Sequence, residues 1–146
     1  MTGVTRSAVI AHARAWIGTP YHHQASLRGV GADCLGLVRG ILREITGVEP
    51  DRLPPYTRDW AEASGDEAML AGARAHLAEV PVGRARPGDV LIFRLRAGLA
   101  AKHAAILASP GTMIHAIEGA PVAEVPYGRW WRRHLAGVFS FPGLDD

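Results

Sequence analysis

One cysteine and two histidines have the clearest capacity for chemistry in this sequence. Cys34 is the only cysteine of the 146 residues. It follows the small residues Gly31-Ala32-Asp33 and begins a segment in which apolar residues recur at helical spacing. A thiol at the start of a helix meets unpaired N–H groups and the positive end of the helix dipole, which favour a thiolate. The position therefore predicts a nucleophilic thiol, the alternative being an inert, buried cysteine.

The residues that follow Cys34 predict the helix that positions it. The apolar stripe that packs on the core begins at Cys34 and continues at helical spacing through Val38, Ile41, Leu42 and Ile45. Asp33 is the expected N-cap, and Gly47 is a suitable end. Because the Asp33 carboxylate opposes the effect of the dipole on the thiol, a thiolate at this position needs a cationic partner.

His103 and His115 fall on two consecutive strand-like runs on either side of the turn residues 109–111. If these three residues form the hairpin loop, Ala105 pairs with His115, and the two histidines become diagonal neighbours on one sheet face. If the pairing register of the two strands shifted by one residue, the two histidines would lie on opposite faces of the sheet. The spacing predicts a relay in which His103 takes the thiol proton and His115 fixes its tautomer. The alternative is two strand histidines with satisfied hydrogen bonds.

Three residues of the loop before the cysteine, and Asp33 beside it, are further candidates for the substrate cleft or the oxyanion site. His22 and His23 either line the cleft or are solvated, and Tyr21 either donates to an oxyanion or packs as a subsite wall. Cys34 and the histidines together could suggest zinc, but their spacing matches no closed structural zinc pattern. We therefore expect neither a metal nor another cofactor.

Composition limits the class of protein. A chain with 48% hydrophobic and 21% charged residues fits one globular domain spanning residues 1–146. No stretch reaches transmembrane length, a single cysteine excludes an intrachain disulfide, and the first ten residues lack a signal-peptide core, so we expect synthesis in the cytoplasm. The net charge of +2 is too small to indicate nucleic acid binding by itself.

The order of the elements predicts an α+β fold, in which helices come first and an antiparallel sheet of about five strands follows. Helices are expected over residues 5–17 and 34–46 and from Ser64 to before Pro81, and strands over residues 89–95, 103–108, 112–117, 122–126 and 135–141. The run Trp130-Trp131-Arg132-Arg133-His134 favours an edge strand with its tryptophans in the core. Docking of a partner protein and stacking on nucleic acid are the alternatives.

Five motifs in this order resemble those of the NlpC-type cell-wall cysteine peptidases, a papain-like family. They are Trp16–Tyr21, Gly31–Leu37, Arg86–Val90, Lys102–Ile106 and Ile114–Ala116. The resemblance implies a papain-like fold whose nucleophile lies at a helix N-terminus packed on the sheet. It implies catalytic roles for Cys34, His103 and His115. It also implies hydrolysis of peptidoglycan stem peptides, typically between γ-D-glutamyl and a diamino acid.

The form Asp33–Arg39 and the stretch Val125–Arg133 resemble the branch of that family encoded with the tail genes of phages and gene transfer agents. This branch implies tail or baseplate partners and action at the cell wall of a target cell. Leu35 departs from the family, because a serine usually follows the nucleophile and helps to recognise the free amine of the substrate. A catalytically idle structural subunit of a tail tip, and a transferase that acylates an amine, are the alternative functions.

Overall fold

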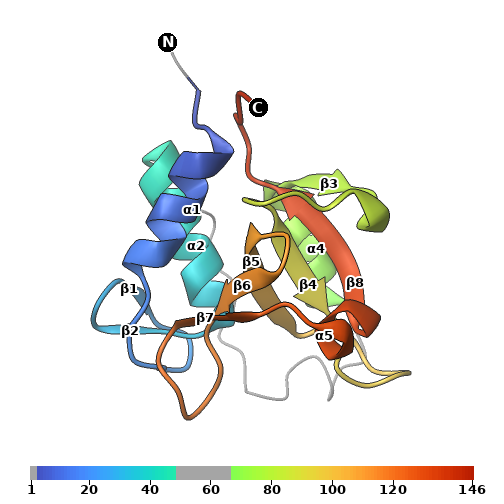
Figure 1. The fold of residues 1–146 in the computed structure, drawn as a ribbon. Coiled ribbons are helices and arrows are strands. Elements are labelled where there is room, and N and C mark those ends of the chain that lie inside the picture. Colours follow the sequence, from blue (N-terminus) through green and yellow to red (C-terminus); the bar gives the residue numbers. More distant parts are fainter. Residues whose placement is uncertain (1–2, 49–66) are drawn as a thin grey trace.

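The computed structural model describes residues 3–48 and 67–146, in which helices precede an antiparallel sheet, as the sequence predicts (Figure 1). The helices are α1 (Arg6–Ala15), α2 (Cys34–Thr46), α4 (Ala68–His76) and α5 (Arg129–Arg133), with a 3-10 turn η1 at Val82–Arg84. The strands are β1 (Ser26–Leu27), β2 (Gly31–Ala32), β3 (Ala78–Val80), β4 (Val90–Phe93), β5 (His103–Ser109), β6 (Thr112–His115), β7 (Ala123–Pro126) and β8 (Leu135–Ser140).

The main sheet has six strands in the order β3-β8-β4-β5-β6-β7, and every neighbouring pair is antiparallel. The expected number of about five is therefore one too low. The missed strand is β3, which has three residues and pairs with β8 at the edge of the sheet. A strand this short cannot show the alternation of apolar and polar residues by which a strand is recognised. The helix expected from Ser64 to before Pro81 starts outside the described residues, and it ends earlier than expected, because α4 stops at His76 and Ala78–Val80 form β3.

The hairpin of β5 and β6 has the predicted register. Ile106 pairs with Ile114 and Leu107 with Met113, which is the pairing that follows from a loop at residues 109–111. The register shifts only at the end of the hairpin, where Ser109 pairs with Thr112. Because side chains alternate between the two faces of a strand, this register places His103 and His115 on one face.

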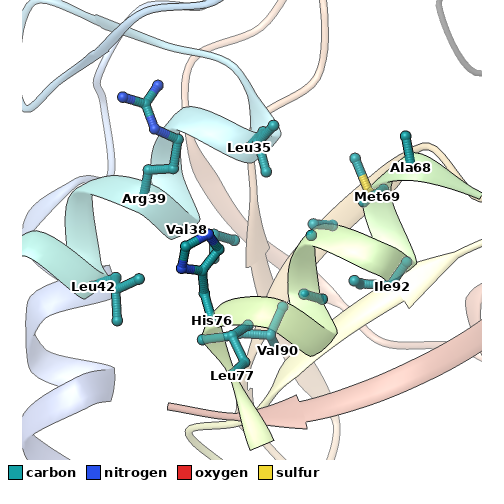
Figure 2. A pocket seen from close by; sticks show the side chains of 13 residues that line it. Leu35, Val38, Arg39, Leu42, Ala68, Met69, His76, Leu77, Val90 and Ile92 are labelled. Carbon is teal, nitrogen blue, oxygen red and sulfur yellow. The ribbon is translucent and has the colours of Figure 1, made fainter. Parts of the chain in front are cut away.

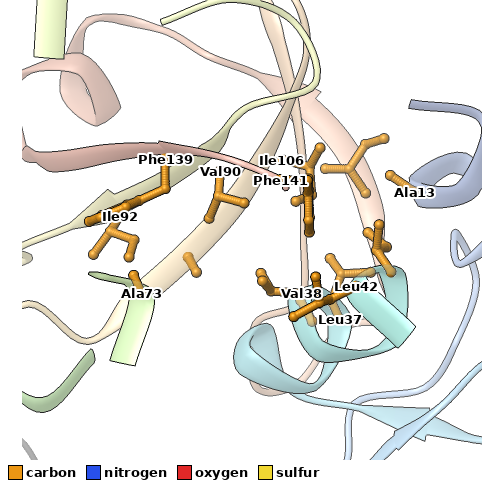
Figure 3. Close-up of a cluster of buried hydrophobic side chains, with 14 of the residues drawn as sticks. Ala13, Leu37, Val38, Leu42, Ala73, Val90, Ile92, Ile106, Phe139 and Phe141 are labelled. Atoms are coloured by element: carbon orange, nitrogen blue, oxygen red, sulfur yellow. The ribbon is translucent and has the colours of Figure 1, made fainter. Parts of the chain in front are cut away.

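Apolar side chains are buried on both faces of the sheet. The larger cluster lies between the sheet and the helices, where Leu37, Val38 and Leu42 of α2 pack towards Val90 and Ile106 (Figure 3). The smaller cluster lies on the opposite face and contains Leu91, Phe93, Ala105, Leu107, Met113, Tyr127 and Val138. Burial of both faces fixes the position of β5, which carries His103 at its first residue.

Helix α2 begins and ends at the residues that the sequence predicts. The Asp33 carboxylate accepts a hydrogen bond of 2.7 Å from the Gly36 N–H, and Gly47 ends the helix at φ 73°. Gly40 faces the ring of Trp16, the C-cap of α1, and a Cβ at this position would clash with that ring. This close approach of α1 to α2 holds the helix that presents Cys34.

A buried ion pair joins α1 to the sheet. The Asp89 side chain is fully buried, lies 2.6 Å from Arg6 Nη1, and accepts hydrogen bonds from Ser140 Oγ at 2.6 Å and the Arg86 N–H at 2.9 Å. We expect Asp89→Ala to lower the free energy of unfolding by about 3–5 kcal/mol, because Arg6 then keeps a largely buried charge without its partner.

Urea unfolding measures this effect, and Arg14→Ala is the matched control. Arg14 forms an ion pair of 3.0 Å with Glu124 in which the arginine is half exposed, so its loss has little effect on stability. Equal losses of stability in the two variants would contradict the role given to Asp89.

Candidate active site

The two histidines of the hairpin form a buried hydrogen-bonded pair. His103 Nε2 and His115 Nδ1 are 2.9 Å apart, and the side chains are only 7% and 4% exposed. The two rings meet edge to face, with centroids 5.1 Å apart and planes at 82°. The predicted ring-to-ring hydrogen bond is confirmed. Because Nε2 is occupied in this way, Nδ1 is the ring nitrogen of His103 that remains for other chemistry.

Aromatic side chains surround this pair. Phe93 of β4 lies beside His103 with ring centroids 6.0 Å apart. The Trp131 ring stacks on His103 at 5.4 Å and 28°, and meets His115 at 5.3 Å and 87°. Trp131 is a functional candidate that sequence analysis missed, since no local pattern reveals that a residue of α5 reaches the start of β5.

The expectation of an edge strand at residues 130–134 is wrong. Residues Arg129–Arg133 form the short helix α5, in which the Arg132 N–H donates to the Gly128 carbonyl. Both tryptophans are expected in the core, but only Trp131 is half-buried, whereas Trp130 is 54% exposed. Arg132 helps to fix the helix, since its guanidinium donates to the Tyr127 and Pro110 carbonyls at 3.0 and 2.7 Å.

Cys34 is the first residue of α2 and is half-buried against the helix-side cluster. Its Sγ lies 3.9 Å from the Lys102 carbonyl oxygen and interacts with the Ala104 backbone N–H. Lys102 and Ala104 are the two neighbours of His103, so the thiol lies against the backbone of the predicted general base. The hydrogen bond from Sγ goes to this carbonyl and not to the imidazole.

The charge state of the site differs from the sequence expectation. Burial, followed by the charge of Asp33, raises the pKa of the Cys34 thiol to about 12, although nearby backbone N–H groups act in the opposite direction. Burial, followed by His115, lowers the pKa of His103 to about 3. The expected resting thiolate is therefore wrong. Desolvation outweighs the helix N-terminus, so burial favours the neutral thiol of Cys34 and the neutral imidazole of His103.

This charge state makes stability depend on pH. Between pH 6.5 and 3 the unfolded chain protonates His103 whereas the folded site does not, so stability falls as the pH falls through this window. Burial lowers the pKa of His115 as well, which acts in the same direction. We expect the free energy of unfolding to decrease from pH 6.5 to 5, by at most about 1.4 kcal/mol per pH unit for each histidine.

Urea unfolding at several pH values measures this slope. His103→Gln removes one of the two groups, so the slope of this variant is expected to be smaller. A slope that the variant leaves unchanged would show that His103 is not held neutral by folding.

The structure gives Asp33 a clear role and separates the other candidates. Besides capping α2, Asp33 accepts a hydrogen bond of 2.7 Å from the Gln24 N–H, which ties the preceding loop to the start of the helix. His23 Nδ1 lies 3.9 Å from Asp33 Oδ2, whereas His22 is exposed and packs on Gly31. Tyr21 is half-buried against the helix-side cluster and pairs with Ala32. The roles of Tyr21, His22 and His23 in substrate binding stay predictions.

An apolar pocket lies between α2 and α4 (Figure 2). Leu35, which follows the thiol, and Ala104, which follows His103, both line it, together with Val38, Met69 and Ile92. Leu35 therefore belongs to an apolar wall beside the nucleophile. Among residues 3–48 and 67–146, no three His, Cys, Asp or Glu side chains are grouped to hold a metal ion. No helix in these ranges has the length and hydropathy to cross a membrane.

Known proteins resemble this chain in sequence and in fold. The chain is 26% identical over 137 residues to the γ-DL-glutamyl hydrolase of Bacillus subtilis strain 168, a match that covers 93% of this chain but only 29% of that protein. The crystal structure of the NlpC/p60 domain of the peptidoglycan hydrolase SagA superposes with a TM-score of 0.69 at 24% identity, covering 94% of this chain and 100% of that one. The peptidoglycan hydrolase RipB of Mycobacterium tuberculosis superposes with a TM-score of 0.60 at 21% identity, and the match covers 92% of this chain and 63% of that one. The NlpC/P60 family model matches residues 18–140, and the chain therefore belongs to the NlpC/P60 family.

Proposed function

We propose that this protein is a cysteine peptidase that hydrolyses the stem peptides of peptidoglycan at the bond between γ-D-glutamyl and a diamino acid. The observation that carries the proposal is the position of Cys34 Sγ, 3.9 Å from the carbonyl that precedes His103, while His103 is hydrogen-bonded to His115 at 2.9 Å. Membership of the NlpC/P60 family supports the peptidase activity. The name of the γ-DL-glutamyl hydrolase supports a γ-glutamyl bond.

The hydrogen bond between the histidines sets the tautomers that the reaction needs. For Nδ1 of His103 to accept the thiol proton, the neutral ring must carry its own proton on Nε2 and donate it to His115 Nδ1. His115 then carries its proton on Nε2. A neutral His115 can accept in this way, and burial favours that form by lowering the pKa of its ring.

The reaction proceeds in two steps. Sγ leaves the Lys102 carbonyl, transfers its proton to Nδ1 of His103 and attacks the peptide carbonyl, forming a carbon–sulfur bond. The C–N bond breaks as His103 returns the proton to the leaving amine. Water, deprotonated by His103, then attacks the thioester and releases the acid and the thiol. The Cys34 N–H at the start of α2 is one donor for the oxyanion, and Tyr21 is a candidate for the second.

Leu35 bears on which bond is cut. Its side chain is a hydrocarbon that lines the apolar pocket, so it offers no hydrogen bond to a substrate amine. The enzyme therefore relies on other groups for that amine, or accepts substrates in which the amine is acylated. Acylation of the peptide N-terminus is the state of stem peptides still attached to glycan.

We also propose that the protein acts as part of a phage-like tail that helps to breach the cell wall. The resemblance of residues 33–39 and 125–133 to the tail-encoded branch supports this location. Mass spectrometry of purified particles tests it, and a particle fraction that lacks the protein would overturn the location without affecting the peptidase activity.

The activity is tested by incubating the protein with defined muropeptides and weighing the products. A synthetic peptide with an α-linked glutamyl bond of the same composition is the control. Cleavage of the γ-linked substrate alone supports the proposal. Products joined to an added amine identify a transferase, and intact substrate identifies an idle structural subunit.

A further inference from the structure

We propose that Trp131 is a positioning residue that holds the His103–His115 pair in its reactive orientation and excludes water from the hydrogen bond between them. This inference rests on the proposed peptidase function and adds a residue to it. Trp131 lies on α5, outside the three motifs that contain Cys34, His103 and His115.

The first argument is that one indole contacts both rings of the pair. The Trp131 ring stacks on His103, with centroids 5.4 Å apart and planes at 28°, so it covers one face of the imidazole. The same ring meets His115 at 5.3 Å and 87°. A side chain that touches both partners of a 2.9 Å hydrogen bond restricts rotation of both rings and occupies the space from which water would compete.

The second argument is that Trp131 is itself held in place. Phe93, which is fully buried, meets the indole edge to face at 5.0 Å. The helix that carries the indole is fixed by the hydrogen bonds of Arg132 to the Tyr127 and Pro110 carbonyls. A residue can position a catalytic group only where its own rotamer is fixed by packing, and Trp131 meets that condition.

The third argument concerns the charge that appears during the reaction. His103 becomes an imidazolium once it has taken the thiol proton, and the buried His115 carries no negative charge to balance it. The stacked face of the indole is the electron-rich side of the ring, and it attracts a cation. The indole therefore excludes water without repelling the charged form of His103.

The test compares Trp131→Ala, Trp131→Phe and Trp130→Ala. Trp130 is the matched control, because it is a tryptophan of the same helix that touches the Trp131 ring at 4.9 Å but is 54% exposed and stacks on His134 rather than on His103. We expect Trp131→Ala to lower kcat on a soluble muropeptide about 10–100-fold with less than a threefold change in KM, since misplacing a catalytic group acts mainly on the chemical step. Trp131→Phe restores most of the rate, and Trp130→Ala keeps it.

A second readout does not depend on catalysis. In ¹⁵N-labelled protein we expect the Nε2–H of His103 to exchange slowly with water in the wild type and in Trp130→Ala, and to exchange rapidly in Trp131→Ala. If the wild type cleaves no muropeptide, the proposed function fails while the exchange experiment still decides the role of Trp131.

Three results would overturn the proposal: unchanged kcat and exchange in Trp131→Ala, a rise in KM alone, or an equal loss of rate in Trp130→Ala. If Trp131→Ala does not fold, Trp131→Leu takes its place. Leucine fills much of the space but lacks the aromatic face, so a folded Leu variant with wild-type kcat and slow exchange would equally overturn it.

Discussion

Replacing Cys34 with alanine is expected to reduce the hydrolysis of γ-glutamyl stem peptides by at least about 10⁴-fold, because no other group in the site can form the acyl intermediate. The side chain is small and half-buried, so its loss leaves α2 and the core intact. Release of peptide fragments from purified peptidoglycan, followed by mass spectrometry, measures the effect.

Cys34→Ser is the control for geometry. It keeps a donor at the same position but replaces the thiol with a poorer nucleophile, and it is expected to be nearly as inactive as the alanine variant. Circular dichroism establishes that both variants are folded. Peptidoglycan digestion by Cys34→Ala at the wild-type rate would exclude the cysteine mechanism.

His115→Ala is expected to lower kcat by between about 10² and 10⁴-fold, because His103 then loses the acceptor that keeps its proton on Nε2. The histidine would be free to adopt the tautomer in which Nδ1 carries the proton, and that tautomer cannot take a proton from Cys34. Steady-state kinetics on a soluble muropeptide measures the loss.

His115→Asn tests the tautomer argument directly, since the amide oxygen can accept from Nε2. It is expected to recover part of the activity that the alanine variant loses. His12→Ala is the matched control, because His12 contacts Glu44 at 2.8 Å between α1 and α2 and takes no part in the pair. Equal activity of the Ala and Asn variants would contradict the role of His115 as an acceptor.

The parts of the site that the sequence predicts correctly depend on local rules. The N-cap of Asp33 and the end of α2 at Gly47 follow from preferences of single residues at helix termini. The pairing of His103 with His115 follows from the length of one tight loop, which sets the register of the whole hairpin. Each of these predictions needs only residues that are close in the sequence.

The parts that the sequence does not predict depend on distant contacts. Trp131 reaches His103 because α5 folds back over the sheet, and no spacing in the sequence encodes that approach. The edge strand β3 forms because β8 offers it a partner from the far end of the chain. The raised pKa of Cys34 also depends on tertiary structure, since burial is a property of the folded core and the helix N-terminus alone indicates the opposite direction.

The protonated state of Cys34 has a consequence for the lifetime of the enzyme. Peroxides attack thiolates far faster than thiols, and the first product, a sulfenic acid, leads on to irreversible oxyacids. A cysteine whose pKa is raised to about 12 presents almost no thiolate at neutral pH. The Cys34 thiol is thereby protected from oxidants at neutral pH.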